Sequence, residues 1–106
     1  MSAAWMVLLL AGLFEVGWAV GLKWSDGFTR LGPALVTVIS MIVSVVLLAR
    51  AAQVIPLGTA YTVWTAIGAV GSVVAGILLF GEPSSPARLF WLALIITGVL
   101  GLKATT

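Results

Sequence analysis

The sequence predicts an all-α integral membrane protein with four transmembrane helices in each subunit. Of its 106 residues, 62% are hydrophobic and 8% are charged, and the mean hydropathy is +1.28. A soluble domain carries roughly 25% charged residues, so this chain lacks the polar side chains that a water-facing surface requires. Because one span takes about 20 residues, the chain has room for at most four spans with short loops and for no soluble domain.

Polar and helix-breaking residues divide the apolar sequence into four segments. A polar loop at residues 23–30 follows the first segment, residues 50–57 separate the next two, and two prolines lie in residues 81–86. The N-terminus has no basic residue and the first segment contains Glu15, so we expect a retained helix there and no cleaved signal peptide. The predicted spans are approximately residues 3–22, 33–49, 58–80 and 87–103, which form a single transmembrane domain.

Glu15 is the one acidic residue that falls within a predicted span. A charged side chain in the middle of a bilayer costs about 2.5–3.5 kcal/mol, so an acid at this depth indicates a functional site by default. No basic side chain and no second acid is expected deep in any span. The partner of Glu15 is therefore predicted to be a proton or an entering cation. The alternative is a protonated Glu15 that makes a structural hydrogen bond between helices.

Two residues lie one helical turn on either side of Glu15 and share its face of the helix. Gly12 is predicted to leave space beside the carboxylate, and Trp18 offers an indole N–H donor and an aromatic face. Trp18 could instead be an interfacial anchor, but it lies several residues inside Lys23. We therefore place it in the site.

The second and third predicted spans contribute further candidates. Ser44 belongs to a stripe of hydroxyl residues in the second span, although such hydroxyls often bond only their own backbone. Tyr61 and Trp64 lie near the start of the third span, where aromatic side chains also serve as interfacial belts. Three glycines are predicted to permit a bend or close helix packing: Gly68, Gly71 and Gly98.

The residue types that are missing exclude several functions. The chain contains no Cys and no His, so we expect no disulfide, no thiol chemistry, no metal site, no cofactor and no enzymatic activity. A net charge of +2 is too weak to indicate nucleic-acid binding.

The basic residues are almost evenly divided between the two ends of the spans. Arg50 and Lys103 lie on one side of a four-span chain, and Lys23, Arg30 and Arg88 lie on the other. The positive-inside rule therefore gives little bias, which permits insertion in both orientations. Four short helices hardly enclose a cavity alone, so we expect the pocket to form between two copies of the chain.

Short motifs occur in order along nearly the whole chain. They are Glu15 in the first span, Lys23 followed by Gly27–Arg30, Pro56–Tyr61 with Trp64, Gly81–Glu82, and Gly98–Val99. With these motifs at these spacings, the chain resembles the small multidrug resistance family. Within that family it resembles the guanidinium exporters, on the basis of Gly12, Glu15–Trp18, Ser44 and Gly101–Thr105.

The resemblance implies an antiparallel, dual-topology homodimer in the inner membrane of a bacterium. Such a dimer exports guanidinium and small substituted guanidinium cations in exchange for protons, by alternating access. Glu15 would be the shared proton and cation site, with Trp18, Ser44 and Trp64 holding its carboxylate or shaping the pocket and Tyr61 acting as a gate.

The chain also departs from the multidrug members of that family. Ala66 replaces the first glycine of their Gly-x-Gly hinge, so bending of the third span would depend on Gly68 or Gly71. Trp91 occupies a position where those members carry a small packing residue, so their dimer contact does not transfer directly.

Three other functions remain open from the residues alone. The nearest is a broad-specificity exporter of hydrophobic quaternary cations. The second is a non-transporting structural or regulatory membrane subunit, although partner subunits usually show a stronger loop-charge bias than this chain. The third is a passive channel, for which we would expect a continuous polar lining instead of one acid.

Overall fold

The protein is a bundle of four helices, seen in a computed structural model that describes residues 2–106. The helices are α1 (Ala3–Trp24), α2 (Leu31–Ala51), α3 (Leu57–Phe80) and α4 (Pro86–Ala104). All four are long and apolar enough to cross a membrane, which confirms the predicted all-α class with four candidate spans. Each helix extends beyond the corresponding predicted span by a residue or two at one end or both.

Local side-chain and backbone features define the ends of these helices. Ser2 accepts a hydrogen bond from the N–H of Trp5 at the start of α1, and Ser85 accepts one from the N–H of Arg88 at the start of α4. Gly81 ends α3 in the left-handed conformation, with φ of 66°, which a residue without a side chain adopts at no steric cost. The prolines of the third connection therefore lie outside α3.

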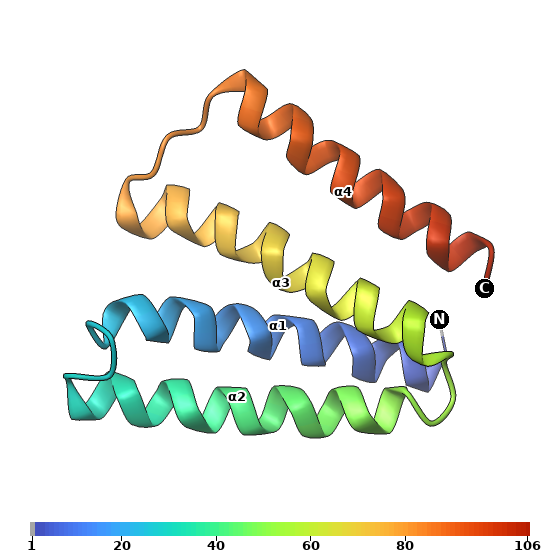
Figure 1. Cartoon of the computed structure of the whole chain (residues 1–106), viewed down its shortest axis with the longest axis horizontal. Coiled ribbons are helices and arrows are strands. Elements are labelled where there is room, and N and C mark those ends of the chain that lie inside the picture. The colour runs from blue at the N-terminus through green and yellow to red at the C-terminus, as the bar shows by residue number, and fades with distance from the viewer. Residues whose placement is uncertain (1) are drawn as a thin grey trace.

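α1 lies between α2 and α3 and packs along both of them, whereas α2 and α3 touch each other only slightly (Figure 1). α4 diverges from α3 at its N-terminal end and approaches it near its C-terminal end. The buried apolar core gathers where the start of α1 meets the end of α2 and the start of α3. It consists of Leu8, Ala11, Leu48, Ala51, Ile55, Ala60 and Val63.

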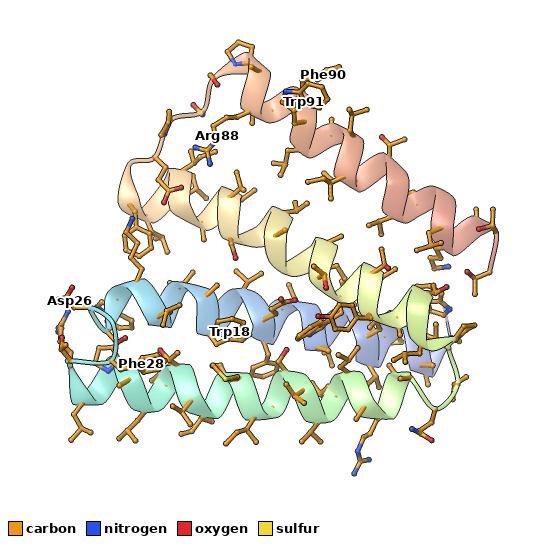
Figure 2. All side chains as sticks on the ribbon, in the orientation of Figure 1. Trp18, Asp26, Phe28, Arg88, Phe90 and Trp91 are labelled. Carbon is orange, nitrogen blue, oxygen red and sulfur yellow. The ribbon has the colours of Figure 1, made fainter. Side chains whose placement is uncertain are left out.

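Much of the helical surface remains apolar and exposed in a single subunit. No residue of α4 is buried within residues 2–106, and Phe90 and Trp91 point away from α3 (Figure 2). Because contiguous apolar surface of this extent is unfavourable in water, lipid or another subunit must cover it.

Candidate functional site

Glu15 lies half-buried on α1 and its carboxyl group faces α3 at Gly68. A Cβ atom on residue 68 would overlap the Glu15 side chain, with Cγ at 2.8 Å and the carboxyl atoms closer. The missing side chain at Gly68 therefore makes the room that the carboxyl group occupies. α3 is helical without interruption from Leu57 to Phe80, so a hinge at Gly68 or Gly71 stays a prediction.

Two buried polar atoms of α1 make no hydrogen bond within residues 2–106. They are Oε2 of Glu15 and Nε1 of Trp18, which lie one helical turn apart on α1. Most buried polar atoms in proteins are paired, and an unpaired one is costly. This part of α1 thus presents one acceptor and one donor that a bound proton, cation or polar group can satisfy.

Ser44 and Trp64 form a hydrogen-bonded link between three helices beside Glu15. The indole Nε1–H of Trp64 on α3 donates to Oγ of Ser44 on α2 at 2.9 Å. The fully buried Ser44 hydroxyl in turn donates to the carbonyl oxygen of Ala11 on α1 at 2.6 Å. In an α-helix, the N–H of residue 15 bonds to this same carbonyl. The link therefore fixes the α1 backbone one turn before Glu15.

The resemblance implied a role at the Glu15 carboxylate for both Ser44 and Trp64. They were expected to hold the carboxylate or shape the pocket, and here their hydrogen bonds lead to the α1 backbone and not to the Glu15 carboxylate. Direct contact with the carboxylate stays a prediction. Sequence reasoning missed the acceptor, Ala11, because a backbone carbonyl leaves no signal in the side-chain pattern.

Tyr61 lies beside this link, one turn before Trp64. Its ring centroid is 5.5 Å from that of Trp64, with an angle of 54° between the rings, and 54% of the residue is exposed. The exposed phenol thus lies next to a half-buried indole, and the gating role of Tyr61 stays a prediction.

Gly12 contacts a residue that the sequence analysis did not name. A Cβ atom on residue 12 would lie 2.5 Å from Cγ2 of Ile67 on α3. Gly12 thus makes space, but Ile67 fills that space in this structure. The sequence pattern carries no signal for this pair, because helix periodicity does not determine the relative depth of two helices.

Gly71 and Gly98, the other two glycines for which a bend or close packing is predicted, differ in their surroundings. Gly71 lies against the Val16 side chain, next to the Glu15 contact, so it permits close approach of α1 and α3. A Cβ atom on Gly98 would meet nothing within 4 Å among the described residues. The packing role of Gly98 therefore stays a prediction.

Comparisons with known proteins agree with this architecture. The family model described as Small Multidrug Resistance protein matches residues 3–95. A guanidinium exporter of Citrobacter freundii is 57% identical over 103 residues, which cover 97% of this chain and 98% of the relative. A guanidinium exporter of Escherichia coli K12 is 56% identical over the same coverage. One of Salmonella typhimurium LT2 is 55% identical over 94% of this chain and 95% of the relative.

Proposed function

Because this chain belongs to the small multidrug resistance family, we propose that it exports guanidinium and small substituted guanidinium cations in exchange for protons, by alternating access. It is a multi-pass membrane transporter and not an enzyme, and we place it in the inner membrane of a bacterium. The observation that carries the proposal is the half-buried Glu15 carboxyl, which faces α3 with an oxygen that no described residue hydrogen-bonds.

The chemistry of Glu15 accounts for both the choice of cation and the coupling. Guanidinium is planar and presents paired N–H donors that match the two oxygens of a carboxylate. An ionised carboxylate within a membrane needs a positive partner, and a proton or a guanidinium ion meets this need. Because one carboxylate holds only one of them at a time, arrival of the cation releases the proton, and the two fluxes are coupled.

The neighbouring residues support this role of Glu15. The link from Trp64 through Ser44 to Ala11 fixes the α1 backbone one turn before the carboxylate. Gly68 leaves room for the carboxyl group against α3. The site is thus held on three helices. A movement of these helices relative to one another would change the side of the membrane from which a proton or cation reaches the carboxylate.

Proton-coupled uptake into proteoliposomes tests the proposal, with a pH dependence of defined sign. Raising the pH removes the competing proton, so the KM for guanidinium should fall as the pH rises. One displaced proton gives at most about a tenfold change per pH unit. The measurement is the initial rate of labelled guanidinium uptake at several pH values. A KM that does not change with pH would exclude competition at a shared carboxylate.

Competition by tetraphenylphosphonium as strong as that by guanidinium would favour the broad-specificity exporter.

We further propose that two copies with opposite orientation form the transporter. The nearly balanced basic residues at the two ends and the exposed apolar surface of α4 support this arrangement. C-terminal fusions to alkaline phosphatase and to green fluorescent protein should both be active, since each reports on one face of the membrane. Activity of only one fusion would contradict the dual topology.

A further inference from the structure

A cavity of about 250 Å³ lies between α1 and α3 at the end of the bundle where α1 finishes. Ala19 in its wall is one helical turn from Glu15, and Ser72 is one turn from Gly68. The cavity therefore begins next to the contact between Glu15 and α3 and extends toward the end of the helices. Its lining residues are Ala19, Val20, Lys23, Ser72, Val73, Gly76, Phe80 and Glu82.

The outer end of this cavity has the components of a cation site. Nζ of Lys23 lies 3.6 Å from Oε2 of Glu82 and 5.0 Å from the centroid of the Phe80 ring. A carboxylate and an aromatic face are the two groups that attract organic cations most directly. Here the ammonium group of the protein's own Lys23 binds to both of them.

The two partners of this ion pair differ in how firmly they are held. The Lys23 side chain is 60% exposed and that of Glu82 is 35% exposed. An ion pair this exposed to solvent is weak, so the ammonium group can leave for water without a large penalty.

Glu82, in contrast, is held from several directions. Its carboxyl group lies over α3 at Gly76, where a Cβ atom would be 2.5–2.8 Å from the three carboxyl atoms. Its backbone N–H donates to the Gly76 carbonyl at 3.1 Å. Arg88 reaches from the first turn of α4 toward the end of α3 (Figure 2), with Nη2 3.6 Å from Oε1 of Glu82. The carboxylate is thus positioned before any other cation arrives.

We propose that Glu82 and Phe80 form an outer binding site for guanidinium at the mouth of this cavity, which the Lys23 ammonium occupies until guanidinium displaces it. The inference deepens the proposed function and rests on it. A guanidinium ion binds the Glu82 carboxylate through its N–H donors and stacks on the Phe80 ring, while Lys23 turns into water. From there, the cation passes along the cavity toward Glu15.

Opposite effects of two substitutions on the KM for guanidinium test this site. Lys23→Gln removes the competing ammonium and should lower the KM about two- to fivefold, the range expected for an exposed ion pair. Glu82→Gln removes the carboxylate and should raise the KM by a similar factor. If the pair were only a structural tie, both substitutions would change transport in the same direction, and that result would overturn the proposal.

The chain offers a matched control for the loss of a lysine. Nζ of Lys103 lies 4.9 Å from the centroid of the Trp5 ring, at the opposite end of the helices from Lys23. Lys103→Gln removes the same charge from a lysine above an aromatic ring and should leave the KM unchanged. If Glu82→Gln fails to fold, Lys23→Gln decides alone, and an unchanged or higher KM overturns the proposal.

A binding measurement separates failure of the outer site from failure of the proposed function. In the Glu15→Gln variant, guanidinium chloride should still shift the amide NMR signal of Gly81 relative to sodium chloride at equal ionic strength. The shift should disappear when Glu82→Gln is added. Absence of the shift in Glu15→Gln overturns the outer site, whereas a parent protein that does not transport guanidinium overturns the proposed function alone.

Discussion

Replacing Glu15 by Gln is expected to abolish proton-coupled guanidinium uptake into proteoliposomes. Gln has nearly the same shape but carries no charge and accepts no proton at ordinary pH. A cation at this depth would then bear the penalty of about 2.5–3.5 kcal/mol for an unpaired charge in the bilayer. That penalty corresponds to a roughly 70- to 400-fold loss. The loss should appear in the initial rate of uptake, and the remaining rate should not depend on a pH gradient.

Asp26→Asn is the matched control for this experiment. Asp26 is an exposed acid in the α1–α2 connection with φ of 53°, a conformation that Asn tolerates. Its neutralisation removes the same charge outside the spans and should leave transport within about twofold of the parent. Thermal unfolding in detergent must show that Glu15→Gln remains folded. Uptake by this folded variant at the parental rate, with the parental pH dependence, would exclude Glu15 as the shared site.

The sequence alone predicted the helices because a membrane imposes strict requirements. Each span needs about 20 apolar residues, and the polar connections around Asp26, Gln53 and Pro83 leave apolar runs of about that length between them. Glu15 was identified as the candidate proton and cation site for a related reason, since an acid in a span is costly. Ser44 and Trp64 followed from hydroxyl and aromatic patterns on single helices.

The contacts between helices could not be predicted from the sequence in the same way. Helix periodicity shows which face a residue occupies but not the depth at which two helices meet. The pairs of Gly12 with Ile67 and of Gly68 with Glu15 depend on that depth. The acceptor for Ser44 is a backbone carbonyl, and every residue carries one.

The contacts of the charged residues in the connections could not be predicted from the sequence either. From the sequence, Lys23 and Arg88 were interpreted as topology markers and Glu82 as part of a family motif. Their ion pairs depend on the left-handed turn at Gly81 and on the bare backbone of α3 at Gly76. A glycine is visible in a sequence, but the group that fills the space beside it is not.

Gly68→Ala is expected to impair transport strongly, although it adds only one methyl group. The new Cβ would overlap the Glu15 side chain, so the carboxyl group must move or α1 and α3 must separate. A misplacement of about 1 Å in a reacting group can cost roughly 100-fold, and we expect transport efficiency to fall by about 10- to 100-fold. The fall should appear as a higher KM for guanidinium in the proteoliposome assay, because the group that binds the cation is displaced.

Gly98→Ala and Gly101→Ala distinguish this clash from a general effect of losing a helical glycine. A Cβ atom at either position would meet nothing within 4 Å in the described part of the chain. Alanine in a helix interior is intrinsically more favourable than glycine by about 0.5–1 kcal/mol, so neither change should destabilise the subunit. If all three substitutions reduced transport equally, the space beside Gly68 would not be what positions Glu15, and helix flexibility or contacts between subunits would be the common cause. If Gly68→Ala alone raised the KM, the closeness of α1 and α3 at that glycine would set the geometry of the cation site.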